Sequence, residues 1–349
     1  MARRLPVFFL LDVSESMIGE PLDQMHQALD LIVQDMRRDP NALETMFVSF
    51  VAFAGKARTL NPLVDLINFY PPELPVGGGT NLGAGLDQVM HEIDSQVIRA
   101  SEGKKGDWKP LVFLLTDGRP TSDSSVAVKK WNDSYRVKRA NIVAVSLGGG
   151  ADTSVLRQIS DDVLVFMDSA PDAYRQFAQW ISNSIKTQSM SVAAGNDGVE
   201  LSKAQPGLVE ELAVGNQSRP GEADDRCVVL VAKCSDSGKP YLIKYERPPA
   251  VDLGARTGDY ELKAVVPVRE TYFEMSDQLA TGGSISSDAL PDSVGSCPYC
   301  GGQALMQCEC EKLFCLRTMG QVSCPWCHES TVVEGNGGGG SFDLSRGMG

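Results

Sequence analysis

The first half of the chain alternates short apolar runs with amphipathic stretches, and this alternation limits its possible folds more than any other feature. Six strand-like runs can be placed before residue 188. They are Val7–Leu11, Phe47–Ala54, Thr59–Asp65, Leu111–Thr116, Ile142–Leu147 and Val163–Met167. Apolar strands that alternate with helices are typical of a mostly parallel sheet covered by helices on both faces. We therefore predict an α/β domain over residues 1–188, whose last helix runs from about Pro171 to Lys186.

The composition changes after this domain and divides the rest of the chain. Residues 189–225 are rich in Ser, Gly, Ala and Asn and are expected to form a linker. Residues 226–280 hold three short strand-like runs, which predict a small β-rich module. A second linker is expected at 281–296, a cysteine-rich module at 297–330 and a flexible glycine-rich tail at 331–349.

The charge and cysteine content narrow the classes of partner. The 45 acidic and 32 basic residues give a net charge of −13, which argues against nonspecific binding to nucleic acid or to an anionic membrane. The short apolar run after Met-Ala-Arg-Arg is interrupted by Asp12, so it does not form a usable signal peptide. We expect a cytoplasmic protein with protein partners and no membrane contact. Clustered cysteines in a reducing compartment indicate metal binding rather than disulfides.

Polar residues with oxygen-bearing side chains interrupt the first domain at three places. Asp12, Ser14 and Ser16 follow the first strand in DVSES, Thr80 lies in GGGTN before a helix, and Asp117 ends a strand in LLTDG. Each place is the predicted carboxyl end of a parallel strand or a helix start that faces this edge, where open α/β sheets bind ligands. These five residues are called the oxygen site below. Taken singly, they could instead be helix caps or an ordinary turn.

Together, the two carboxylates and three hydroxyls provide hard oxygen ligands without any histidine or cysteine. This chemistry suits Mg²⁺, with Mn²⁺ or Ca²⁺ as alternatives. Mg²⁺ commonly retains water at several of its six positions, so an ion bound here would have room for an incoming carboxylate. The sequence therefore predicts a hard-cation site whose last ligand comes from elsewhere.

The three motifs resemble the metal-ion-dependent adhesion site of von Willebrand factor A domains, which have a Rossmann-like fold. The resemblance covers roughly the first half of the chain, and all five positions match. It implies that Ser14, Ser16 and Thr80 contribute hydroxyl oxygens, whereas Asp12 and Asp117 act mostly through water. It also implies that an acidic side chain of a protein partner completes the site.

An enzymatic alternative is less well supported by the sequence. A strand that ends in DxSxS is similar to the aspartyl-nucleophile motif of haloacid dehalogenase-type phosphatases, but those carry a second carboxylate where Ser14 stands. General acid–base catalysis would need a histidine or a carboxylate pair at the site. His26 and His91 fall on predicted helices away from the strand ends, so we predict no catalysis.

A second candidate metal centre lies in the cysteine-rich module. Two C-x2-C pairs, Cys297/Cys300 and Cys324/Cys327, have the spacing at which one turn presents two thiolates to a tetrahedral Zn²⁺. Cys308, Cys310 and Cys315 lie between them, and His328 follows. One zinc ion on four cysteines is the conservative interpretation. We favour two ions, because the seven cysteines and His328 supply eight ligands. Cys227 and Cys234 have an odd spacing and are expected to be buried thiols.

The order of these parts resembles TerY-type proteins of bacterial tellurite-resistance and related stress operons. This resemblance rests on domain order and on the CPYCG and CPWC pattern. Because such proteins are typically encoded beside a protein kinase and a PP2C-type phosphatase, it implies a scaffold or a phosphorylation-regulated role. Our hypothesis is a non-catalytic adaptor for protein partners, such as that kinase and phosphatase. The alternative is a zinc-containing subunit of a transcription and repair complex, similar to TFIIH, that contacts nucleic acid. The acidic charge and the complete oxygen site favour the adaptor.

Overall fold

The computed structural model describes most of the chain. The described residues are 3–103, 105–117, 120–136, 138–147, 153–166, 173–193, 202, 209–211, 226–247, 260–277, 282–291, 293–333 and 343–347. Met167 and Pro171, expected at the ends of a strand and a helix, lie outside this set, as do most of the expected linker at 189–225 and residues 334–342 of the tail. Among the described residues, no helix has both the length and the apolar character that a membrane span requires.

The first domain contains the six expected strands and a seventh short one. The strands are β1 (Leu5–Asp12), β2 (Met46–Phe53), β3 (Ala57–Asp65), β4 (Leu111–Thr116), β5 (Asn141–Leu147), β6 (Asp162–Phe166) and β7 (Val209–Glu211). Their order in the sheet is β3-β2-β1-β4-β5-β6-β7. Five strands are mutually parallel, and β3 and β7 add antiparallel edges. The chain winds away from β1 in both directions, which makes the β1–β4 boundary a topological switch point.

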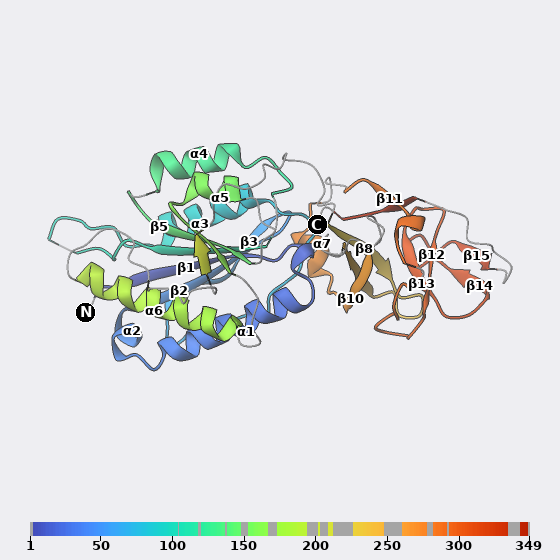
Figure 1. Cartoon of the computed structure of the whole chain (residues 1–349), viewed down its shortest axis with the longest axis horizontal. Helices are drawn as coiled ribbons and strands as arrows, with labels where there is room; N and C mark the ends of the chain where they lie inside the picture. Colours follow the sequence, from blue (N-terminus) through green and yellow to red (C-terminus); the bar gives the residue numbers. More distant parts are fainter. Residues whose placement is uncertain are drawn as a thin grey trace.

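Helices cover both faces of this sheet (Figure 1). They are α1 (Glu20–Met36), α2 (Pro40–Thr45), α3 (Leu82–Gln96), α4 (Ser125–Ser134), α5 (Thr153–Ile159) and α6 (Ala173–Ala193). Side chains of β1 alternate between two cores, because successive residues of a strand point to opposite faces. Phe9 packs in the core under α1, α2 and α6, whereas Phe8 packs in the core under α3, α4 and α5. A fully buried central strand explains the continuous apolar run in the sequence.

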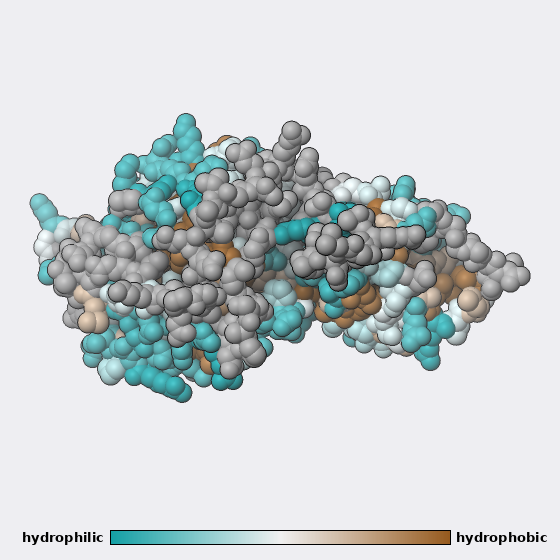
Figure 2. Space-filling view, in the orientation of Figure 1, coloured by the Kyte–Doolittle hydropathy of each residue, from teal (hydrophilic) through white to brown (hydrophobic). Residues whose placement is uncertain are grey.

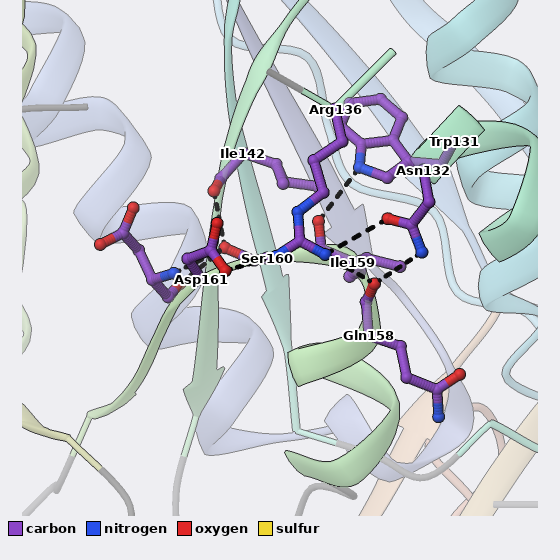
Figure 3. A network of polar contacts seen from close by, with 9 residues as sticks. Trp131, Asn132, Arg136, Ile142, Gln158, Ile159, Ser160 and Asp161 are labelled. Atoms are coloured by element: carbon purple, nitrogen blue, oxygen red, sulfur yellow. Dashed lines mark hydrogen bonds and ion pairs between the residues drawn. The ribbon is translucent and has the colours of Figure 1, made fainter. Parts of the chain in front are cut away.

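Polar contacts fix the outer helix α4 to the end of α5 (Figure 3). The Trp131 indole donates to the carbonyl of Ile159 at 3.0 Å, and the Asn132 amide donates to the carbonyl of Gln158 at 2.8 Å. The Ser160 hydroxyl donates to the carbonyl of Ile142 at 2.7 Å, which joins the start of β6 to β5. The first two bonds satisfy carbonyls at the end of α5, and the one from Trp131 is buried.

The second half forms one five-stranded sheet, rather than the separate β-rich and cysteine-rich modules expected from the sequence. Its strands are β8 (Cys227–Lys233), β9 (Pro240–Glu246), β10 (Glu261–Pro267), β12 (Ala304–Gln307) and β13 (Leu313–Leu316). The order is β10-β9-β8-β13-β12. Parallel pairing of β13 with β8 at Leu313–Ala232 and Phe314–Lys233 joins the two expected modules. Composition does not reveal this pairing, because it forms across about 80 residues of sequence.

Smaller elements complete this half. A hairpin is formed by β14 (Gly320–Ser323) and β15 (Ser330–Val333). Within the expected tail, β16 (Asp343–Ser345) pairs antiparallel with β11 (Ser284–Ser286) of the second expected linker. The other elements are η1 (Glu15–Met17), α7 (Thr271–Met275) and η2 (Ser287–Ala289).

The two halves meet end to end, with α7 at the junction (Figure 1). Ile18 of the first half packs with Val229, Leu242 and Tyr272 of the second in one buried cluster. The Tyr272 hydroxyl donates to the buried Glu15 carboxyl, and the amide of Lys56 donates to the carbonyl of Met275 at 2.9 Å. Figure 2 shows hydrophilic residues over the outer helices of the larger lobe and a hydrophobic area on the smaller lobe close to the junction.

This junction generates a prediction for Tyr272→Phe. The substitution removes one hydrogen bond to a fully buried carboxyl, so the free energy of unfolding should fall by about 1–3 kcal/mol. Tyr70→Phe is the matched control, since Tyr70 is 70% exposed and should lose almost nothing. Urea denaturation followed by fluorescence measures both. Equal stability of the two variants would show that this bond does not hold the halves together.

Candidate metal centres

Asp12 is the last residue of β1, and the fold buries it completely. Its carboxylate accepts a hydrogen bond from the Thr116 hydroxyl at 2.5 Å and another from the amide of Ser14 at 3.0 Å. Thr116 ends the neighbouring strand β4, so the side chain of Asp12 lies across the switch point between β1 and β4. Both contacts orient the carboxylate toward the loop that follows β1.

The two serines of this loop and Asp117 form a continuous chain of oxygen atoms. The hydroxyls of Ser14 and Ser16 lie 2.9 Å apart, and the Ser16 hydroxyl donates to Asp117 at 3.0 Å. Ser14 precedes η1 but makes no capping hydrogen bond through its side chain, and the N-cap of α1 is Gly19. The simple interpretation of these serines as helix caps therefore does not describe them.

Thr80 reaches the same edge from the glycine-rich loop before α3. The loop is tied to the β1 side by the amide of Gly77, which donates to the carbonyl of Val13 at 3.0 Å. Thr80 itself is 2% exposed, and its amide donates to the hydroxyl of Thr121 at 2.8 Å. The cap of α3 is the next residue, Asn81, whose side chain accepts from the amide of Ala84 at 2.9 Å. The Thr80 side chain is thus not needed as a helix cap.

The electrostatics of the oxygen site fit a bound cation. Desolvation raises the pKa of Asp12, in spite of hydrogen bonds from Ser14 and Thr116 that lower it. Desolvation and the neighbouring Asp12 carboxylate raise the pKa of Asp117 to about 7. The nearby positive charges of Lys244 and Arg226 offset the repulsion between the two buried carboxylates only in part, so a divalent ion would be stabilised beside them. The donor set of carboxylates and hydroxyls suits Mg²⁺ and contains no soft ligand.

The second half of the chain stands directly over this site. The Lys244 ammonium donates to the carbonyls of Ser16 at 2.6 Å and Ile18 at 3.1 Å. A cavity of about 250 Å³ remains between the halves, lined by Ser16, Asp117, Leu147, Arg226, Cys227, Glu246 and Arg247. Sequence reasoning missed Lys244 and Glu246. The signal that could have revealed them is a lysine and a glutamate at alternate positions of the otherwise apolar strand PYLIKYE.

Eight cysteines form two groups of four. The first cysteine cluster consists of Cys234, Cys297, Cys300 and Cys315. The second cysteine cluster consists of Cys308, Cys310, Cys324 and Cys327. Within each group the sulfur atoms all lie within 4.8 Å of one another. The ninth cysteine, Cys227, is a buried thiol at the start of β8 and lies in neither group, as the sequence suggested.

The sulfur spacing fits tetrahedral zinc. Zn–S bonds of about 2.3 Å in a tetrahedron place the sulfur atoms about 3.8 Å apart. The Cys310–Cys324 distance is 3.8 Å, the Cys308–Cys327 distance is 3.6 Å and the Cys300–Cys315 distance is 3.4 Å. In the first cluster, the amide of Ser235 also donates to the sulfur of Cys315 at 3.3 Å. Such donors stabilise thiolates, which are the form that binds metal.

Cys234 takes the place that the sequence analysis gave to His328. Pairing of β8 with β13 brings the end of β8 beside Cys315, so Cys234 joins the first cluster instead of being only a buried thiol. His328 belongs to neither group. Its amide donates to the carbonyl of Cys324 at 2.9 Å with φ at +66°, and Gly301 has the same backbone role after Cys297. His328 is therefore a turn residue of the C-x2-C loop.

The turn after Cys234 has the same backbone hydrogen bonds as the C-x2-C turns, which is typical of a metal-ligating cysteine. The amide of Cys234 donates to the carbonyl of Lys239, and the amide of Gly238 donates back to the carbonyl of Cys234. Cys297 makes the equivalent pair of bonds with Gly302 and Gly301, which lie five and four residues later. Gly238 also has positive φ, at +68°. A cysteine four residues before a glycine at a strand end is the signal that the sequence analysis passed over.

Comparison with known families agrees with both centres. The von Willebrand factor type A domain model matches residues 7–179, and the TerY-C metal binding domain model matches residues 224–349. The chain is a von Willebrand factor type A domain joined to a TerY-C metal-binding domain. The two cysteine clusters lie in the span that matches the TerY-C model, and the five residues of the oxygen site lie in the span that matches the A-domain model.

Individual relatives are distant in sequence. Inter-alpha-trypsin inhibitor heavy chain H1 of Sus scrofa is 28% identical, and the match covers 37% of this chain and 15% of the relative. Inter-alpha-trypsin inhibitor heavy chain H6 of Homo sapiens is 24% identical, and the match covers 44% of this chain and 12% of the relative. The chain thus spans less than a fifth of the length of these relatives.

Among solved structures, proximal thread matrix protein 1 of the mussel byssus, with a zinc-occupied MIDAS motif, is 19% identical to this chain. The match covers 52% of this chain and 46% of that chain, and the TM-score is 0.36. A von Willebrand factor type A protein of Catenulispora acidiphila is 14% identical over 80% and 69%, with a TM-score of 0.39.

The cluster assignment predicts different effects for two cysteines that flank the same strand. Native protein purified without chelator should hold about two zinc ions, one for each cluster. Cys234→Ser should lose about one of them and unfold more readily, because structural zinc supplies on the order of 10 kcal/mol in small modules. Cys227→Ser, equally buried but outside the clusters, should keep both. Elemental analysis measures the zinc content per chain of both variants. A full zinc content in Cys234→Ser would exclude Cys234 as a zinc ligand.

Proposed function

We propose that the chain is a non-catalytic adaptor that binds a protein partner through a metal ion at the oxygen site. The observation that carries this proposal is the assembly of Asp12, Ser14, Ser16, Thr80 and Asp117 at one edge of the sheet. The three hydroxyls carry no formal charge, so they neutralise little of the charge of a divalent ion. Bound Mg²⁺ would therefore remain electrophilic and attract a carboxylate of the partner.

The surroundings of the oxygen site support binding rather than catalysis. Among the described residues, no histidine lines the cavity beside Ser16 and Asp117. His26 and His91 lie on the surfaces of α1 and α3, where His26 faces Asp30 at 3.6 Å. The thiol in the cavity belongs to Cys227, and burial raises its pKa to about 12, so it is not an activated nucleophile.

The match to the TerY-C domain motivates a finer proposal. We propose that the adaptor acts in the cytoplasm, in a bacterial stress system of the tellurite-resistance type. Its partners in this proposal are a protein kinase and a PP2C-type phosphatase. The A domain would bind one partner through its metal ion, and the TerY-C domain, held rigid by zinc, would present a second surface.

The nucleic-acid alternative has less support from the cysteine-rich region. Arg317 is paired with Asp236 at 3.1 Å. Lys312 and Lys233 both lie over the ring of Trp326, and Phe273 meets the same ring edge to face. The ring of Trp326 therefore already contacts two lysines and a phenylalanine within the chain, and a stacked base would compete with these contacts. With a net charge of −13, the chain also lacks the basic balance of most nucleic-acid-binding proteins.

Partner capture should depend on the metal and on Asp12. Immobilised wild-type protein should recover the kinase or phosphatase from lysate in Mg²⁺ and lose at least about tenfold of this recovery in EDTA, since the ion supplies the contact. Asp12→Asn should bind no better in Mg²⁺ than wild type does in EDTA. Asp133→Asn, an exposed carboxylate on α4, is the control and should behave as wild type.

Two results would contradict the proposal. Equal recovery with and without EDTA would remove the metal from the interaction. Tight and salt-sensitive binding of the full chain to DNA or RNA would favour the nucleic-acid alternative, because phosphate contacts weaken steeply as salt rises.

A further inference from the structure

The TerY-C domain supplies one wall of the cavity at the oxygen site, and that wall contains a carboxylate. Glu246 lines the cavity together with Ser16 and Asp117 of the A domain. It is the last residue of β9, and its register partner on β8 is Cys227, which also lines the cavity. The regular alternation of the strand places Leu242, Lys244 and Glu246 on the same face, toward the A domain. Leu242 packs in the cluster that contains Ile18, which confirms this orientation.

Lys244 holds Glu246 in this position. Its ammonium group forms an ion pair with the Glu246 carboxylate at 2.7 Å and donates to the carbonyl of Ser16 at 2.6 Å. Both contacts share one nitrogen atom, so the carboxylate is fixed beside the loop that carries Ser14 and Ser16. The side chain of Lys244 is 3% exposed, whereas that of Glu246 is 39% exposed. A buried, fully bonded lysine is a rigid support for the more accessible acid.

The charge balance of the cavity gives Glu246 a role. The TerY-C domain brings Lys244, Arg226 and Arg247 close to a site that is built for a cation. Positive charge there opposes a divalent ion. Glu246 is the one carboxylate that the described part of the TerY-C domain adds to the lining. Its negative charge offsets the repulsion between these basic side chains and a divalent ion.

The same junction limits what can approach from outside. The Ser276 hydroxyl accepts from the amide of Gly78 at 2.7 Å, and the amide of Asp277 donates to the carbonyl of Gly78 at 3.3 Å. These contacts close the side of the site next to the glycine-rich loop. The remaining 250 Å³ is smaller than a typical small-molecule pocket of about 300–1,000 Å³. It has room for a carboxylate side chain.

We propose that Glu246 is an internal acidic ligand of the metal ion, which completes the oxygen site in the chain without a partner. A partner's carboxylate then has to replace Glu246, so the strength of the internal ligand sets the affinity threshold for partners. This inference rests on the proposed function, because it assumes that the oxygen site holds a divalent ion.

The test uses Mn²⁺ as a probe on the full, zinc-loaded chain. Titration calorimetry measures its affinity, and water-proton relaxation measures the number of water molecules bound to the ion. Glu246→Gln should weaken Mn²⁺ binding by about tenfold or more and add one bound water. Glu261→Gln is the matched control. Glu261 faces Glu246 across the β9–β10 pair and is bonded to Lys263 at 2.8 Å, but it does not line the cavity.

The possible outcomes separate this inference from the proposed function. Loss of affinity with one more bound water in Glu246→Gln, and neither change in Glu261→Gln, supports the internal ligand. Unchanged affinity, or weaker binding with the same number of waters, overturns it. If wild type binds Mn²⁺ no better than Asp12→Asn, the oxygen site itself is not a metal site and the proposed function fails first.

Discussion

Strand β8 has to bury both of its faces, and the positions of both metal centres depend on this constraint. Val228, Leu230 and Ala232 point into the core that adjoins the first cysteine cluster. Cys227 and Val229 point the other way and pack against Ile18 of the A domain. An isolated TerY-C sheet would expose this second face to water. Burial of about 25 cal/mol per Å² of apolar surface therefore favours its docking on the A domain.

The polar contacts at the junction make the docking specific. Apolar packing alone is non-directional and would allow several orientations of the two domains. Lys244 is seated on the carbonyls of Ser16 and Ile18, and Glu15 accepts from Tyr272, in positions where water is excluded. Sliding one domain would leave these buried polar groups without partners, which costs about 1–3 kcal/mol for each group. The polar contacts therefore select one relative orientation of the two domains, whereas apolar burial only favours their association.

The sequence predicted features that depend on local pattern and missed those that depend on pairing between distant segments. The A-domain strands and the three oxygen-bearing motifs were visible, because each apolar run and each strand end is encoded within about ten residues. The two C-x2-C pairs were visible for the same reason. Cys234 was not, because it becomes a ligand only when β8 pairs with β13. Lys244 and Glu246 were missed because their role depends on the contact between domains, which no short motif records.

The two kinds of metal centre are connected through one pair of strands. The first cysteine cluster fixes the end of β8 at Cys234, and the β8–β9 register then sets Val229 opposite Lys244 and Cys227 opposite Glu246. A shift of one residue would turn Lys244 and Glu246 away from the oxygen site, because side chains alternate with period two. The cysteine cluster at one end of the sheet therefore determines which charges face the oxygen site at the other. In this arrangement the TerY-C domain is more than a neighbour of the A domain, since it forms one wall of the cavity at the oxygen site.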